Sequence, residues 1–81
     1  MNNILIVFAS LTTANKVKSE LEKRFGISSK VMQTPGAIKL KSCSYCLRIS
    51  DDNLNTALGF IKENDVRTKG AYRESDYSKI Y

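Results

Sequence analysis

The chain has no histidine and no tryptophan among its 81 residues, and it has only one proline and two cysteines. Without histidine it cannot form a Ser/His or Cys/His nucleophile pair, and no imidazole is available to bind a metal. A structural zinc site needs four ligands, which two thiols cannot supply within one chain. We therefore expect no metal and no cofactor, and we expect any chemistry to depend on the thiols.

Long hydrophobic runs are also missing. No apolar stretch approaches the roughly 20 residues needed to span a membrane. The start of the chain, Met1 to Asn3, lacks the basic region of a signal peptide. The two cysteines stand three positions apart, so a disulfide between them would close a loop too short to hold a secreted fold together. These absences predict a cytoplasmic protein with reduced thiols and no membrane contact.

What remains is the composition of an ordinary globular domain, with 42% hydrophobic and 26% charged residues. A chain of this size forms one domain and buries only about 60% of its unfolded surface. The formal net charge of +5 favours anionic partners, although scattered basic residues also serve as a solubilising surface. Only Lys39 and Lys41 lie beside the cysteines.

The first half of the chain predicts a strand followed by a helix. Residues 4–8 are a continuous apolar run rich in β-branched side chains, as in a central strand covered on both faces. Apolar residues then recur at spacings of three and four, and Gly26 suits a helix end. Three residues of good N-cap type stand where this helix begins. The apolar stripe is Ala14, Val17, Leu21 and Phe25, and the N-cap candidates are Ser10, Thr12 and Thr13.

The second half predicts three more strands and a second helix. A strand over 27–33, with Val31 as its best core residue, ends at the break Thr34-Pro35-Gly36. A strand follows in which core residues alternate with Cys46 and Arg48. Asp51 and Asp52 then open the second helix. The expected core residues of this half are Tyr45, Leu47 and Ile49 in the strand and Leu54, Ala57, Leu58 and Ile61 in the helix, before a last strand over 66–72.

The order strand, helix, strand, strand, helix, strand is that of the split βαβ, or ferredoxin-like, α+β sandwich. It predicts a four-stranded antiparallel sheet of order 4-1-3-2 with both helices on one face. We expect one such domain over residues 1–73 and a polar tail over 74–81. The first strand is apolar on both faces, so something must cover the face without helices. A second subunit or the 36–42 arm would do so, and we expect a homodimer.

This topology separates the two cysteines. The third strand begins beside the end of the first, which places Cys43 near the amides of residues 10–13. A helix N-terminus favours a thiolate, and nearby lysines add to the effect. Cys46 alternates with the core residues and is expected to face the open side of the sheet. The alternative is that both cysteines are small, buried apolar residues with no chemical role. A thioredoxin or copper-chaperone site would instead place the pair at the start of a helix.

Several short elements of the sequence also match a known family. They are Phe8 ending the first strand, Ala14 in the helix, Gly26 closing it, Thr34-Pro35, and Cys43-Ser44-Tyr45-Cys46-Leu47-Arg48. In these elements, over residues 4 to about 73, the chain resembles the small bacterial selenium/sulfur (Se/S) carrier protein-like family. Cys43 falls on the cysteine of that family. Ser44 replaces the usual glycine, and Cys46 falls where a small residue is common.

The resemblance implies a carrier rather than a turnover enzyme. Cys43 would accept sulfane sulfur or selenium from a donor such as a cysteine desulfurase and pass it to an acceptor protein. Cys46 would then be able to attack the loaded Cys43 and leave a disulfide. The supporting site would comprise Ser10, Thr12, Thr13, Lys39, Lys41 and Ser44.

Two other classes of function remain open. The ferredoxin-like fold also hosts RNA-binding modules, which stack bases on aromatic residues of the first and third strands. Here those aromatics are Phe8 and Tyr45, and Tyr45 is expected to face the core, so we do not expect nucleic acid as a partner. The other alternative is a non-catalytic, dimeric interaction or regulatory domain.

Overall fold

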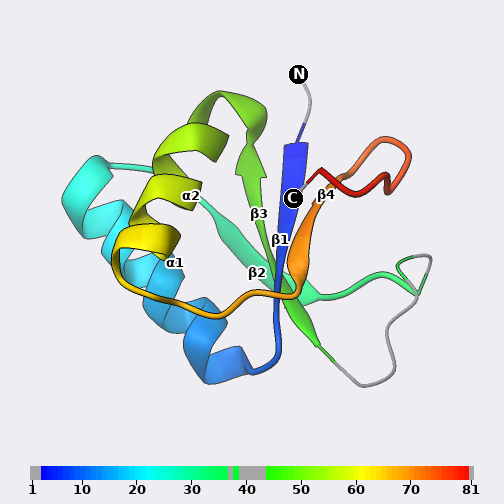
Figure 1. Ribbon diagram of the computed structural model, residues 1–81, viewed down its shortest axis with the longest axis horizontal. Helices are drawn as coiled ribbons and strands as arrows, with labels where there is room; N and C mark the ends of the chain where they lie inside the picture. Colours follow the sequence, from blue (N-terminus) through cyan, green and yellow to red (C-terminus); the bar gives the residue numbers. More distant parts are fainter. Residues whose placement is uncertain (1–2, 37, 39–43, 81) are drawn as a thin grey trace.

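The computed structural model of the chain describes residues 3–36, 38 and 44–80. Within these residues the strands and helices follow one another in the order that the sequence predicts (Figure 1). The elements are β1 (Asn3–Phe8), α1 (Leu11–Phe25), β2 (Lys30–Gln33), β3 (Tyr45–Ser50), the short 3₁₀ helix η1 (Asp51–Asn53), α2 (Leu54–Glu63) and β4 (Gly70–Arg73).

The strands form one sheet in the order β2-β3-β1-β4, which is the predicted 4-1-3-2 order counted from the opposite edge. Each neighbouring pair is antiparallel. The register places Phe8 opposite Tyr45 and Tyr45 opposite Gln33. The end of β1, the start of β3 and the end of β2 therefore share one end of the sheet.

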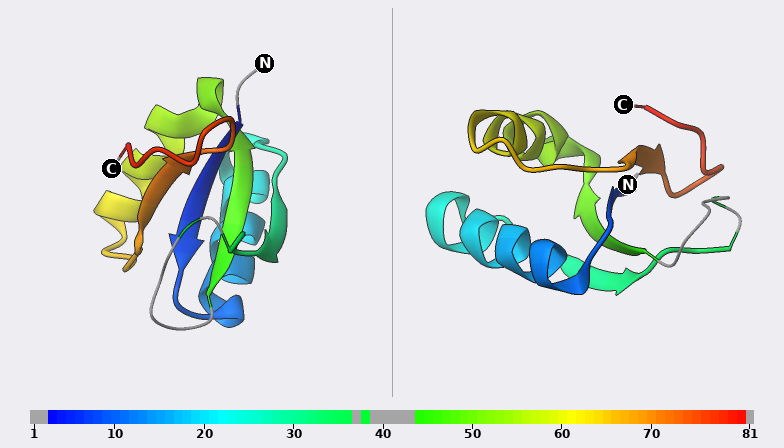
Figure 2. Two further views of the ribbon diagram at one scale, coloured as in Figure 1. Left: turned by 90° about the vertical axis from the view of Figure 1, so that its right-hand side faces the viewer. Right: turned by 60° about the horizontal axis from the view of Figure 1, so that its bottom comes forward.

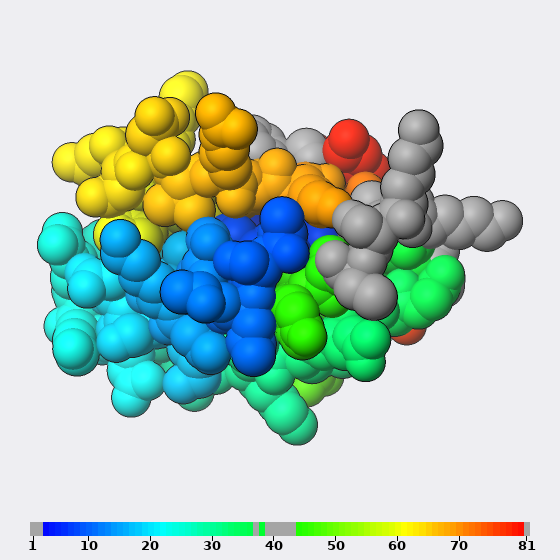
Figure 3. All heavy atoms as spheres, turned by 90° about the horizontal axis from the view of Figure 1, so that it is seen from below, coloured from blue at the N-terminus to red at the C-terminus, as the bar shows by residue number. Residues whose placement is uncertain are grey.

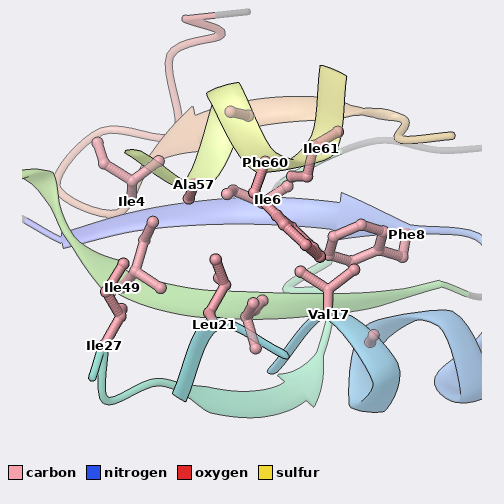
Figure 4. Close-up of a cluster of buried hydrophobic side chains, with 13 residues drawn as sticks. Ile4, Ile6, Phe8, Val17, Leu21, Ile27, Ile49, Ala57, Phe60 and Ile61 are labelled. Atoms are coloured by element: carbon pink, nitrogen blue, oxygen red, sulfur yellow. The ribbon is translucent and has the colours of Figure 1, made fainter. Parts of the chain in front are cut away.

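Both helices cover the same face of this sheet, as the right-hand view of Figure 2 shows. Alternate residues of β1 and β3 point toward the helices and make the main core with them (Figure 4). That core includes Ile27, which comes before β2 and not within it. The buried members of this cluster are Ile4, Ile6, Phe8, Ala14, Val17, Leu21, Ile27, Leu47, Ile49, Ala57, Phe60, Ile61 and Ala71.

The boundaries of α1 follow from its end residues. Ser10 is the N-cap, and its side chain accepts a hydrogen bond from the backbone N–H of Thr13. Gly26 closes the helix in the left-handed conformation, with φ of 66°, as expected. The prediction for Phe25 is wrong, because its side chain is 48% exposed. Phe25 lies on the predicted stripe and packs against Phe60 in a T-shaped arrangement, with ring centroids 6.2 Å apart.

The buried face of α2 and the start of β4 also differ from the sequence prediction. In α2 the buried residues are Ala57, Phe60 and Ile61, whereas Leu58 is only half-buried. The last strand begins at Gly70 and not at Val66, which packs against the core from a loop. Gly70 has φ of 113°, a conformation that residues with side chains rarely adopt, so the chain turns there before it enters the sheet.

Residues 74–80 fold back along the outer side of β4. Tyr72 forms a β-bridge with Lys79, and the N–H of Ile80 donates to the carbonyl of Ala71 at 2.7 Å. Tyr77 allows the reversal by adopting a positive φ of 58°. One edge of the sheet is thus covered by the chain itself.

Candidate functional site

The predicted site is the end of the sheet where β3 begins. Because Tyr45 pairs with Phe8, the chain enters β3 beside the last residue of β1, and α1 starts only three residues after Phe8. The first backbone N–H groups of a helix have no partner within the helix and carry part of its positive dipole. The backbone N–H of Thr13 donates to Ser10 Oγ at 3.1 Å, so this amide has a partner. The Ser10 hydroxyl in turn donates to Thr13 Oγ1 at 2.9 Å. Thr12 lies in the same first turn.

Ser44 is the predicted site residue that the structure places most firmly. It is buried, and its hydroxyl donates to Thr34 Oγ1 at 2.9 Å. The backbone N–H of Thr34 donates in turn to the carbonyl of Ser44 at 3.1 Å. In the sequence Thr34 is part of a turn and of the family resemblance but not of the predicted site, yet it holds the residue that follows Cys43. Cys43, Lys39 and Lys41 lie outside the described residues.

Cys46 lies on the face of the sheet opposite the helices, as strand alternation predicts. It is fully buried there and not exposed to solvent. We call this side of the sheet the far face, defined by Leu5, Val7, Cys46 and Ile38, with Met32 and Tyr72 packed at its margin. Ile38, which belongs to the predicted 36–42 arm, is only 6% exposed and covers the sheet residues. The far face is thus closed within one chain by a residue of the arm.

The surroundings of Cys46 oppose ionisation. Burial raises the pKa of the Cys46 thiol to about 11, and a hydrogen bond from the Thr34 side chain only partly offsets this rise. The negative charge of Glu74 adds to the increase. Since the thiolate is the nucleophilic form, Cys46 is an unreactive thiol in this conformation.

An ion pair that the sequence analysis missed crosses the other end of the far face. Arg48 Nε lies 2.7 Å from Glu74 Oε2, and Arg48 Nη2 donates to Glu74 Oε1 at 2.9 Å. Asn3 Nδ2 donates to the same carboxylate at 3.2 Å. These bonds, above all that from Arg48, hold the pKa of Glu74 below its usual range, and the carboxylate raises the pKa of Arg48. Strand alternation places Arg48 on the side of Cys46, but nothing in the sequence indicates Glu74 as its partner.

Other kinds of site find little support in the described part of the chain. No group of three or more acidic or cysteine residues there is arranged to hold a metal ion. None of its helices is both long and apolar enough to cross a membrane. Phe8 is buried under the helices and Tyr45 packs on the same side, so neither lies on the face where RNA-binding modules stack bases.

Comparison with protein families gives a match over most of the chain. A family model described as "Putative Se/S carrier protein-like" matches residues 3–73, which includes every strand and helix described above. Comparison with curated proteins and with solved structures finds no match. The matched region contains both cysteines and is nearly the whole chain. The chain therefore belongs to the Se/S carrier protein-like family.

Proposed function

We propose that this protein carries sulfur or selenium as a persulfide or perselenide on Cys43, between a donor enzyme and an acceptor protein. The observation that carries the proposal is the family match over residues 3–73. The element order and the one-sided helix layer are those of ferredoxin-like domains, and we infer that the domain is of this type. The donor would be an enzyme of the cysteine desulfurase kind, acting in the cytoplasm.

The chemistry is an exchange between sulfur atoms with no net oxidation. The Cys43 thiolate attacks the terminal sulfur of the donor's persulfide, and a new S–S bond forms on Cys43. The donor's own S–S bond breaks, and its electron pair leaves on the donor cysteine as a thiolate. An acceptor thiolate then repeats the same step on loaded Cys43. The protein must therefore supply an ionised thiol and stabilise an anionic product.

The end of the sheet where β3 begins suits both needs. Ser44 is fixed there by its two hydrogen bonds with Thr34, and α1 starts at the same end. A helix N-terminus stabilises a nearby anion by about 0.3–1 kcal/mol at an exposed site. Ser10, Thr12 and Thr13 at the start of α1, and the lysines Lys39 and Lys41, are the residues we propose to assist Cys43.

Cys46 fits a structural role better than a reactive one. To discharge loaded Cys43 it would attack the inner sulfur as a thiolate, form a disulfide and release hydrosulfide. A buried thiol with a pKa of about 11 is almost entirely protonated at neutral pH. We propose that this protects the cargo, because the second thiol cannot release it until Cys46 becomes exposed.

The proposal is tested by loading the protein with a cysteine desulfurase and L-cysteine and measuring the intact mass. We expect the wild type and Cys46→Ala to gain sulfur and Cys43→Ser to gain none. Circular dichroism of each variant checks that the fold is retained. Loading of Cys43→Ser equal to that of the wild type would sink the proposal, as would a wild type that never gains sulfur.

A dimeric interaction domain is the alternative function. From the sequence, either a second subunit or the 36–42 arm would cover the face without helices, and a homodimer was expected. In the structure Ile38 covers Leu5, Val7 and Cys46 on that face. The far face therefore gives no specific support to a dimer, and the homodimer stays a prediction.

A further inference from the structure

A groove runs along α1, on the side that faces the segment between α2 and β4. Figure 3 shows the seam between the atoms of α1, in blue to cyan, and the yellow to orange atoms that lead into β4. The groove has a volume of about 680 Å³, within the range of sites that bind ligands. Val17, Phe60 and Val66 provide apolar lining. These three residues lie outside the site proposed for the thiol, whereas Thr13, which also lines the groove, belongs to the residues proposed to assist Cys43.

The rim of the groove is charged. Lys16, Arg24 and Arg67 contribute cations, and Glu20 and Asp65 contribute carboxylates. Arg24 and Glu20 neutralise each other, with Nε and Oε2 2.7 Å apart, and the Arg24 guanidinium carbon lies 5.8 Å from the centroid of the Phe60 ring. The remaining charges leave an excess of one cation. In a chain of net charge +5, this favours a ligand that combines negative charge with an apolar group.

The length of the groove indicates the kind of ligand. Thr13 and Arg24 both line it, and the rise of the helix from one to the other is about 16 Å. An extended chain rises about 3.3 Å per residue, so about five residues of peptide would fit this length. We propose that the groove binds a short acidic peptide segment of a partner protein. Its apolar side chain packs on Val17, Phe60 and Val66, and its carboxylates lie beside Lys16 and Arg67.

The position of the groove relates it to the proposed carrier function. Ala9 and Thr13 form one end of it, and Ala9 directly follows the residue that pairs with Tyr45 at the start of β3. A partner held in the groove would therefore reach the end of the sheet proposed to hold Cys43. Only this identification of the partner, as the protein that loads or unloads the thiol, rests on the proposed function.

The test titrates the ¹⁵N-labelled full chain with the capped peptide Asp-Glu-Phe-Asp-Glu and follows its amide resonances. We expect shifts concentrated at Thr13, Lys16, Val66 and Arg67. The double variant Lys16→Glu/Arg67→Glu should weaken binding about tenfold, because each reversal removes an attraction and adds a repulsion. Both residues are exposed, so the variant should keep its fold. Lys62→Glu, an exposed residue that does not line the groove, is the matched control.

Three results would overturn the groove assignment. They are an absence of shifts at millimolar peptide, equal binding by the double variant, and the same shifts with inorganic phosphate, which would indicate a small-anion site. Loading with sodium polysulfide distinguishes this proposal from the carrier function. Because polysulfide needs no docking, the double variant should gain sulfur on Cys43 as fast as the wild type. Failure of that loading in the wild type would contradict the carrier function and leave the peptide result unaffected.

Discussion

At the scale of single residues, the structure explains why the Cys46 thiol resists ionisation. Cys46 occupies a strand position between Val7 on β1 and Met32 on β2, with Ile38 over it. Its sulfur is enclosed by apolar side chains, so ionisation loses the solvation that water would give the thiolate. Strand alternation predicted the side of the sheet correctly. It could not predict burial, because the cover comes from a residue eight positions earlier in a segment without a regular period.

We predict that Cys46 is alkylated slowly and with a high apparent pKa. In Cys43→Ser, iodoacetamide labelling should accelerate with pH up to about 11, the value to which burial raises the pKa of Cys46. In guanidinium the same thiol should titrate with a pKa of about 8.5, as an exposed cysteine does. Ile38→Ala should speed labelling of the folded protein, because Ile38 belongs to the cluster of side chains in which Cys46 is buried. Rapid labelling of folded Cys43→Ser at neutral pH would contradict this account.

At the scale of elements, α1 is the best defined by its sequence. Three residues were equally good N-cap candidates, and the structure selects Ser10, whose Oγ accepts the N–H of Thr13 at 3.1 Å. Thr12 and Thr13 lie inside the helix instead. The cap residue determines where the amides at the start of α1 lie, and these amides are proposed to assist the thiol.

Ser10→Ala should lower the free energy of unfolding by about 1 kcal/mol, the usual cost of losing an N-cap side chain. Urea denaturation followed by circular dichroism measures it. Ser10→Asp should retain most of the stability, because its carboxylate also accepts the N–H and interacts favourably with the helix dipole. Equal stability of Ser10→Ala and the wild type would show that the cap contributes nothing.

The elements that the sequence predicted less well share a physical cause. Apolar spacing identifies the inward side of a helix but not how far the sheet extends beneath it, so Phe25 was assigned to the core. In α2 the same spacing also left Phe60 out, although it is buried. The start of β4 was placed too early because Val66 is apolar, and an apolar loop residue over the core resembles a strand residue. The return of residues 74–80 along β4 depends on backbone hydrogen bonds, which leave no apolar pattern.

At the scale of the whole molecule, one ion pair joins segments that are distant in the sequence. Glu74, just after β4, meets Arg48 of β3 and Asn3 of β1, and its backbone N–H also donates to the carbonyl of Asn3 at 3.0 Å. Together these contacts hold the beginning of the chain, the centre of the sheet and the returning C-terminal segment in one place. Long-range side-chain pairs of this kind carry no local sequence signal.

This ion pair should make stability depend on pH. The folded pKa of Glu74 is lowered, chiefly by the hydrogen bond from Arg48. The pair therefore stabilises the fold at pH values above the ordinary glutamate pKa, about 4.3, and this contribution is lost as pH falls through the lower folded value. Glu74→Gln should thus be less stable than the wild type at neutral pH, and the difference should disappear in acid.

Urea denaturation of both proteins at neutral pH and at about pH 3 measures this effect, since carboxylates titrate in that range. Glu63→Gln, which removes an exposed carboxylate of α2, should show a smaller difference at neutral pH. High salt should reduce the effect of Glu74→Gln, because the side chains of the pair are partly exposed and are screened by ions. A difference between Glu74→Gln and the wild type that is the same at both pH values would mean that the ionised carboxylate does not hold these segments together.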